Sequence, residues 1–245
     1  MRLRTLLRAA GAATILAAAA VSAASAEMDR AEVEKIVREY LLANPEILNE
    51  MIAELQAREQ TSAAEKAKTG IAENKDALFH DGYSYVAGNP NGDVTLVEFF
   101  DYRCGYCRKV RPELVTLMEQ DGGVRLILKE FPILSPTSHE ASKAAIASMN
   151  QGGDLYWKFH QAMLAADGLD SPTIYDIAAD VGLDVERLKK DMEDPSVEQK
   201  IAQNHELAEK LGVDGTPAFI IGDKLYPGAL GVDEMKELVA AQRGG

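Results

Sequence analysis

The sequence predicts an α/β domain with an inserted helical block, preceded by a helical extension at the N-terminus. Two apolar strand patterns, at residues 93–100 and 124–132, flank a helical pattern and together form a βαβ unit. Strand patterns return only at residues 217–228, after a long helical stretch. This interruption between the strands predicts the insertion.

The composition is that of a soluble globular protein. Of the 245 residues, 47% are hydrophobic and 27% are charged. The formal net charge is −13, which argues against a nucleic-acid partner because such surfaces need clustered positive charge. We attribute the acidity to solubility.

Residues 1–26 have the pattern of an export signal that is cleaved after Ala26. Arg2, Arg4 and Arg8 form a basic start, an apolar run follows, and small residues end the segment. The alternative is an uncleaved anchor, although the run is short for a membrane span. Cleavage would remove three Arg and no acidic residue, which takes the net charge from −13 to −16.

Residues 27–56 predict two amphipathic helices. Apolar residues recur at helical spacing, and Asn44 and Pro45 end one helix and begin the next. An apolar stripe must be buried, either on the main domain or against another copy of the chain. A linker follows at residues 57–80, rich in Ala, Lys and Glu, which predicts semi-rigid or frayed helix. We therefore expect an oligomerisation segment joined to a movable catalytic domain.

Residues 81–245 form the predicted catalytic domain. The strand at 93–100 leads into the two cysteines, and a helix and the strand at 124–132 follow. The block at 137–211 predicts five helices, the first capped by Thr137 and Glu140. A strand pair and a closing helix end the chain.

The segment DYRCGYCRKVRP holds the only two cysteines, Cys104 and Cys107. Cys104 is expected at the start of a helix, where free N–H groups and the helix dipole favour thiolate and lower its pKa from about 8.5. Arg103 and Arg108 are expected to add to this effect. Cys107 follows one helical turn later and can attack Cys104 to close a disulfide.

The cysteine pair has two other chemical uses. A structural disulfide across two residues closes a very small loop and stabilises little. Two thiolates supply half of a zinc site, and the four histidines (His80, His139, His160 and His205) lack the spacing of a second ligand pair. We therefore assign no metal and no cofactor. A two-ligand Cu(I) site remains an alternative, because thiolates suit that ion.

Several motifs together carry a family resemblance. They are VEFFDYRCGYC, LKEFPIL, the helical block at 137–211, and GVDGTPAFIIG. With them, residues 82–243 resemble the DsbA-like branch of the thioredoxin superfamily, the exported bacterial thiol:disulfide oxidoreductases. The resemblance implies a thioredoxin fold with an inserted helical domain, a periplasmic location, and protein substrates that carry cysteines.

The resemblance also implies roles for individual residues. Pro217 matches the family's cis-proline, which lies beside the active-site sulfurs, and Thr216 precedes it. With Gly105 and Tyr106, these residues are expected to bind substrate.

Two charged residues complete the implied catalytic set. Glu98 matches a buried acid below the active site that could accept the proton of Cys107. Lys129 matches a lysine placed near that acid. The expected catalytic residues are therefore Cys104, Cys107, Glu98 and Lys129.

The Gly105-Tyr106 dipeptide resembles that of the isomerase DsbC rather than the Pro-His of the oxidase DsbA. We therefore expect isomerase or reductase activity, with a dithiol oxidase of the same fold or a Cu(I)-binding periplasmic chaperone as alternatives. A membrane redox partner, reductase or oxidase, would set the direction. The N-terminal helices resemble those of suppressor-of-copper-sensitivity and Com1-like members, which implies a homo-oligomer, such as a trimer, through residues 28–56.

Overall fold

The structure, a computed structural model, describes residues 29–244. The chain divides into two units, Met1–Glu54 and Leu55–Gly245, which are described separately. The export signal expected at residues 1–26 lies outside the described residues.

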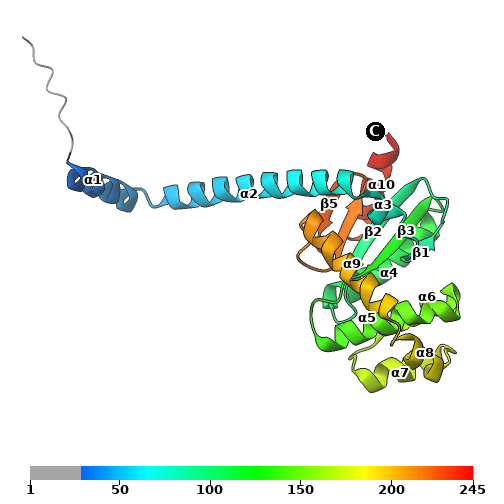
Figure 1. The fold of residues 1–245 in the computed structure, drawn as a ribbon. Helices are drawn as coiled ribbons and strands as arrows, with labels where there is room; N and C mark the ends of the chain where they lie inside the picture. Colours follow the sequence, from blue (N-terminus) through cyan, green and yellow to red (C-terminus); the bar gives the residue numbers. More distant parts are fainter. Residues whose placement is uncertain (1–28, 245) are drawn as a thin grey trace, which may run out of the picture. The chain divides into compact units, whose positions relative to one another are not determined.

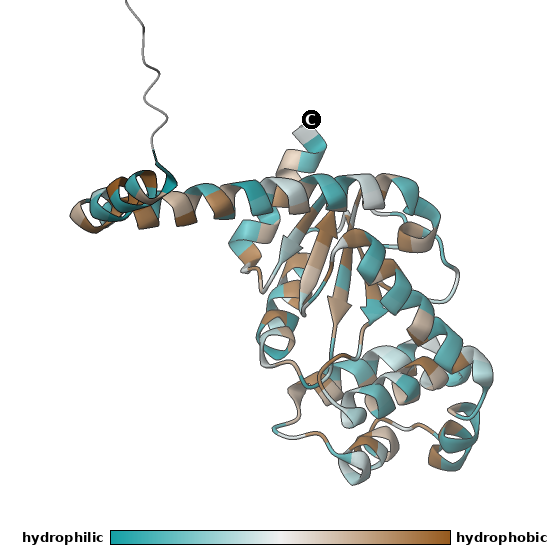
Figure 2. Ribbon diagram, turned by 60° about the vertical axis from the view of Figure 1, so that its left-hand side comes forward, coloured by the Kyte–Doolittle hydropathy of each residue, from teal (hydrophilic) through white to brown (hydrophobic). Residues whose placement is uncertain are grey.

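The first unit consists of α1 (Arg30–Ala43) and the beginning of α2 (Glu46–Glu73). The backbone N–H of Asn44 donates to the carbonyl of Tyr40 and ends α1. Large apolar side chains of both helices are between 38% and 72% exposed. They are Val33, Ile36, Val37, Tyr40, Leu41, Leu42, Leu48, Met51 and Ile52. In the ribbon of Figure 2, brown hydrophobic and teal hydrophilic residues alternate along these helices. An exposed apolar band of this length is typical of an interaction surface.

The predicted linker is not separate from the second helix. α2 continues without a break to Glu73, and α3 (Lys75–Phe79) follows it. Within the second unit, Ala67, Gly70 and Ile71 are buried. A Cβ on Gly70 would lie 2.6 Å from the carbonyl oxygen of Lys210, so only glycine permits this close approach. The whole of the predicted linker, residues 57–80, therefore lies in the second unit, which also holds the predicted catalytic domain and is called the catalytic unit below.

The catalytic unit is built on a five-stranded sheet, with the order β1-β3-β2-β4-β5 (Figure 1). The strands are β1 (Tyr85–Gly88), β2 (Val94–Phe100), β3 (Val124–Glu130), β4 (Ala218–Ile221) and β5 (Lys224–Pro227). β2 and β3 are parallel and joined through α4 (Gly105–Gln120), and the other pairs are antiparallel. The predicted α/β fold and βαβ unit are confirmed. β1 was not predicted, because its four residues end at a glycine and are too few for a clear alternation.

The predicted block of five helices is also confirmed. It comprises α5 (Pro136–Ser148), α6 (Gly153–Ala165), α7 (Ser171–Asp180), α8 (Val185–Asp191) and α9 (Pro195–Leu211), with a 3₁₀ turn at Met149–Gln151. α10 (Val232–Gly244) closes the described chain.

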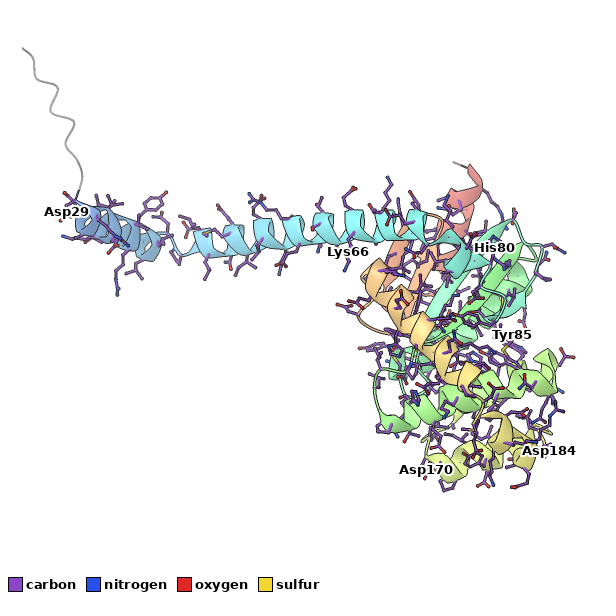
Figure 3. The ribbon with its side chains drawn as sticks, in the orientation of Figure 1. Asp29, Lys66, His80, Tyr85, Asp170 and Asp184 are labelled. Atoms are coloured by element: carbon purple, nitrogen blue, oxygen red, sulfur yellow. The ribbon has the colours of Figure 1, made fainter. Side chains whose placement is uncertain are left out.

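Side chains cap several of these helices. Asp170 and Asp184 accept hydrogen bonds from first-turn N–H groups of α7 and α8 (Figure 3). The predicted cap of α5 at Thr137 is wrong. Ser135 caps this helix instead, because Pro136 already occupies its first position.

Both faces of the two central strands are buried. Leu96, Phe100 and Leu128 pack with α4 and the helical insertion on one face. Phe99 and Ile127 pack on the other face with residues of α2, α3 and α9. Since side chains alternate along a strand, even-numbered residues of β2 and β3 share the first face and odd-numbered residues share the second. This parity decides which charged residues meet.

Lys129 belongs to the second face and is fully buried. Its Nζ donates to Asp81 Oδ2 at 2.5 Å and to the carbonyl of Ala77 at 2.7 Å. The same nitrogen lies 5.5 Å from the ring centroid of Tyr83. Through its hydrogen bond and ion pair, Lys129 thus connects the segment between α3 and β1 to the sheet.

We predict that Lys129→Met lowers the free energy of unfolding by about 3 kcal/mol, because it leaves the Asp81 carboxylate without its cation. Burial raises the pKa of Asp81, but the charge and hydrogen bond of Lys129 outweigh it and hold the pKa below its ordinary value. A lowered carboxyl pKa stabilises the fold above the unfolded pKa, and this is lost as pH falls through the folded pKa.

Urea unfolding at neutral and acidic pH measures the effect. The difference between the wild type and Lys129→Met should shrink in acid, and Asp81→Asn in the same background should recover part of the loss. An equal loss at every pH would contradict this assignment.

Candidate active site

Cys104 occupies the N-cap position of α4, where the chain leaves β2 and turns into the helix. Its Sγ accepts a hydrogen bond from the backbone N–H of Cys107 at 3.4 Å. Its own N–H donates to the carbonyl of Asp101 at 3.0 Å. The sulfur therefore faces unpaired N–H groups at the positive end of the helix dipole.

The buried carboxylate of Asp101 fixes the loop that carries Cys104. Its Oδ1 accepts from the N–H of Arg103 at 2.7 Å. Its Oδ2 accepts from the N–H groups of Ile133 and Leu134 at 2.9 and 3.0 Å. The cysteine loop and the segment after β3 are thus held together by one side chain.

The pKa of Cys104 is lowered to about 5. The main cause is a hydrogen bond from the Cys107 thiol, which outweighs the raising effect of burial. The Thr216 side chain and the N–H groups of Cys107 and Tyr106 lower the pKa further. Hydrogen bonds rather than the expected arginines dominate, and the Arg103 guanidinium donates to the carbonyl of Leu169 instead.

The two thiols differ sharply. Cys107 is fully buried, whereas Cys104 retains 6% of its surface. Burial raises the pKa of Cys107 far above its ordinary value, and the hydrogen bond with Cys104 and the charge of Glu98 act in the same direction. At neutral pH the pair is therefore a thiolate with a small exposed area and a thiol with none.

The fold brings Thr216 to Cys104 across 112 positions of sequence, with 3.1 Å between the cysteine Sγ and the threonine carbonyl oxygen. The Thr216-Pro217 peptide bond is cis. Tyr106 is 62% exposed, and a Cβ on Gly105 would meet nothing within 4 Å. The four residues expected to bind substrate therefore lie around Cys104, with open space beside it.

Glu98 lies on the same sheet face as α4 and is only 2% exposed. Its Oε1 has no hydrogen-bond partner. Burial raises the pKa of Glu98 to about 8, and the charges of Cys104 and Glu130 contribute. A carboxyl group that titrates near neutrality thus lies close enough to the cysteine pair to sense its charge.

The expectation that Lys129 lies beside Glu98 is wrong. Lys129 has odd parity, so it points to the opposite face and pairs with Asp81. The charged residue that shares the face of Glu98 is Glu130, which sequence reasoning missed. The strand pattern could have indicated this, because Glu130 alternates in step with Leu126 and Leu128, which are buried on the face that Glu98 shares.

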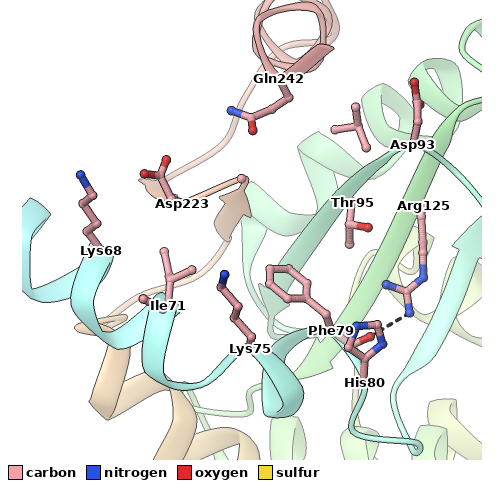
Figure 4. Close-up of a pocket in the computed structure, with 13 residues that line it drawn as sticks. Lys68, Ile71, Lys75, Phe79, His80, Asp93, Thr95, Arg125, Asp223 and Gln242 are labelled. Carbon is pink, nitrogen blue, oxygen red and sulfur yellow. Dashed lines mark hydrogen bonds between the residues drawn. The ribbon is translucent and has the colours of Figure 1, made fainter. Parts of the chain in front are cut away.

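Away from the cysteines, the described residues include a cavity but no cluster suited to a metal ion. Within residues 29–244, no three His, Cys, Asp or Glu side chains are arranged to hold a metal ion. A cavity of about 530 Å³ is lined by Lys68, Phe79, Arg125 and Asp223, among others (Figure 4). Val94, the first residue of β2, also lines this cavity. Cys104 follows the last residue of β2, so the cavity lies at the other end of the strand from the cysteines. None of the helices in the described part of the chain has the length and apolar character to cross a membrane.

Two family models match the chain. The model of the DSBA-like thioredoxin domain matches residues 95–240. The model of the copper resistance protein ScsC N-terminal domain matches residues 29–61, which cover the exposed apolar helices.

Two solved structures are similar to this chain. A thioredoxin-like oxidoreductase from Silicibacter pomeroyi is 44% identical, with a TM-score of 0.68, and the match covers 70% of this chain and 99% of that one. ScsC from Proteus mirabilis in a transitional conformation is 32% identical, with a TM-score of 0.67, and the match covers 87% and 94%.

Curated relatives include a probable disulfide bond formation protein D from Bacillus anthracis, 27% identical over 56% of this chain and 69% of that protein. Na⁺/H⁺ antiporters also match. The chain spans 24% of the length of the one from Salinispora tropica, to which it is 28% identical over 63% of its own length. The sheet order, the cysteines at the start of α4 and the match over residues 95–240 lead to one conclusion: this chain belongs to the family of the DSBA-like thioredoxin domain.

Proposed function

We propose that this protein is an exported thiol:disulfide oxidoreductase that exchanges disulfides in protein substrates through Cys104 and Cys107, acting as an isomerase or reductase. The observation that carries the proposal is the opposite behaviour of the two thiols within one helical turn. The pKa of Cys104 falls to about 5, while that of Cys107 rises far above its ordinary value. At neutral pH the Cys104 thiolate is the nucleophile, whereas Cys107 remains a protonated thiol.

The reaction begins when the Cys104 thiolate attacks one sulfur of a substrate disulfide. The substrate S–S bond breaks, a mixed disulfide forms on Cys104, and the other substrate sulfur leaves as a thiolate. A substrate thiolate can then attack the mixed disulfide, which rearranges the substrate and restores Cys104. Alternatively Cys107 attacks Cys104, so that the substrate leaves reduced and the enzyme pair becomes a disulfide.

Glu98 has a role in the second route. The Cys107 thiol must lose its proton before its sulfur can attack, yet burial strongly disfavours the free thiolate. The Glu98 carboxylate can take this proton, because it lies on the same buried face and titrates near pH 8. Proton transfer within the protein then replaces escape of the proton to water.

Substrate is proposed to bind over the exposed surface beside Cys104. Tyr106, Ile133 and Leu134 are exposed apolar side chains on the two segments joined by Asp101. The backbone of Thr216, next to Pro217, lies against the sulfur and can pair with an extended peptide. Apolar contacts with backbone pairing suit unfolded protein segments rather than one defined sequence.

The isomerase or reductase and the dithiol oxidase differ in the direction in which they exchange disulfides. A stabilised thiolate favours the reduced enzyme and makes the disulfide form a better oxidant, which supports the dithiol oxidase. The Gly105-Tyr106 dipeptide and the apolar helices of residues 29–54 support the isomerase instead. A membrane redox partner would keep the pair reduced or oxidised.

The apolar band of the first unit is proposed to join copies of the chain into a homo-oligomer, such as a trimer. Support comes from its exposure and from the match of residues 29–61 to the ScsC N-terminal model. Export through residues 1–26 would place the assembly in the periplasm, where disulfides persist.

Refolding of a ribonuclease with scrambled disulfides tests the function. We expect the full-length protein to restore ribonuclease activity and Cys104→Ser to restore none. A variant lacking residues 29–54 should keep its reactive thiol but lose oligomeric mass and most of the isomerase activity. Turnover only when the enzyme is supplied oxidised would favour the oxidase, and tight Cu(I) retention without turnover would favour the copper carrier.

The ionisation of Cys104 gives a second prediction. The rate of alkylation by iodoacetamide should rise with pH around a midpoint near 5, because only the thiolate reacts. Cys104→Ser supplies the background rate. A midpoint near that of a free cysteine, about 8.5, would remove the basis of the proposed function.

The role of Glu98 gives a third prediction. Glu98→Gln should slow the attack of Cys107 on the mixed disulfide by about 100-fold, the usual scale of general-base catalysis, while formation of the mixed disulfide stays fast. Rapid acid quenching and mass analysis of the reaction with oxidised glutathione separate the two steps. Lys129→Met is the matched control, since it removes a buried charge from the opposite sheet face. An equal loss in both variants would refute the role.

A further inference from the structure

A second buried carboxyl group, Glu130, lies at the end of β3 and is 3% exposed. Its Oε1 accepts from the hydroxyl groups of Tyr102 and Tyr156, each at 3.0 Å. Its Oε2 interacts with the hydroxyl of Ser142 at 2.8 Å. No Lys or Arg among residues 29–244 forms an ion pair with it. A buried carboxyl group held only by neutral donors is costly to ionise and calls for an explanation.

The hydrogen bonds suit both protonation states of Glu130. The Ser142 hydroxyl can donate to a carboxylate or accept from a carboxylic acid, so either form is satisfied. Tyr102 also contacts His160 Nδ1 at 3.0 Å. Burial lowers the pKa of His160 to about 3, and the charge of Arg111 contributes, so the ring is neutral and can donate to Tyr102. The hydrogen bonds around Glu130 are therefore compatible with both its protonated and its ionised form.

The sheet register places Glu130 next to the active-site acid. Phe100 of β2 pairs with Glu130 of β3, and Glu98 pairs with Leu128. Glu98 and Glu130 are therefore diagonal neighbours on one buried face. The charge of Glu130 raises the pKa of Glu98, and burial raises the pKa of Glu130 itself to about 8. The titratable groups that face the two carboxyls are Cys104, Cys107, Asp101, Tyr102, Tyr156 and His160.

We propose that Glu130 is a positioning residue of the redox site: it forms with Glu98 a coupled pair of buried carboxyl groups and sets the pH at which Glu98 can take the proton of Cys107. The inference rests on the proposed function and extends it to a residue outside the reacting atoms. Tyr102 connects the pair to the loop of Cys104, since it lies two positions before that cysteine and donates to Glu130.

When Cys107 attacks the mixed disulfide, its S–H bond breaks and the proton passes to the Glu98 carboxylate. The Cys104–Cys107 bond forms with the electron pair of the Cys107 sulfur, and the bond from Cys104 to substrate breaks, so that the substrate leaves as a thiolate. A negative charge on Glu130 makes Glu98 a stronger base but leaves it ionised only at higher pH.

The test is the pH profile of this step in Glu130→Gln. Reduced protein is mixed with oxidised glutathione, and release of the second glutathione is followed from about pH 5 to pH 10. In the wild type we expect the rate to rise through a midpoint near 8. In Glu130→Gln the midpoint should fall by about one unit, because one of two coupled charges is gone. An unchanged midpoint in a folded variant overturns the proposal.

Asn204→Ala is the matched control. The Asn204 side chain donates to the backbone carbonyl of Glu130 at 3.0 Å, so the variant weakens the same strand end without changing a charge. It should lower stability and leave the midpoint in place. A shift in this control equal to that of Glu130→Gln would assign Glu130 a structural role only and overturn the coupling.

A second measurement covers the case in which Glu130→Gln does not fold. Infrared titration of the carboxyl C=O stretch in Glu98→Gln follows Glu130 directly. Coupling is reciprocal, so the Glu130 midpoint should fall in this variant relative to the wild type, and an unchanged midpoint overturns the proposal. This readout needs no turnover. If the wild type forms no mixed disulfide with glutathione, the proposed function fails, while the infrared midpoints still decide the coupling.

Discussion

The chemistry of the site depends on the hydrogen bonds that stabilise the Cys104 thiolate at the beginning of α4. A negative sulfur is stable there because the Cys107 thiol, the Thr216 side chain and the N–H groups of the first helical turn all donate to it. These donors belong to the first turn of α4 and to the side chain of Thr216, which is 112 positions away in the sequence. The sheet, the crossover helix and the insertion together hold these donors in place, so the chemistry of one atom rests on the packing of the whole catalytic unit.

The second cysteine and the carboxyl groups behind it follow from the same packing. Strands β2 and β3 are buried on both faces apart from the second residue of each, so Glu98, Lys129 and Glu130 are removed from water. Lys129 is compensated by Asp81 on one face. Within residues 29–244, Glu98 and Glu130 form no ion pair on the other face, and burial raises the pKa of each to about 8. The same sheet therefore uses one buried charge for stability and keeps two carboxyl groups that can exchange protons near neutral pH.

The first unit obeys a different constraint. Its two helices have almost no buried side chains among the described residues, and their apolar residues face outwards. Isolated amphipathic helices gain most of their stability from packing, so this band calls for a partner surface. In the catalytic unit the reverse holds, because α2 ends by burying Ala67, Gly70 and Ile71. The helix α2 thus carries exposed apolar residues that need a partner surface near its beginning and residues that are already buried near its end.

The sequence alone determined the α/β class, the helical insertion, the two central strands and the cysteines at a strand-to-helix junction. These follow from local patterns such as periodicity, glycine and proline positions, and capping residues. It placed Lys129 with Glu98, whereas the structure has Glu130 there, because strand parity and register decide which side chains share a face. β1, the continuation of α2 to Glu73 and the contact of Thr216 with Cys104 also required the tertiary structure. Short strands, helix lengths and contacts distant in sequence are decided by what packs against them, which no local pattern records.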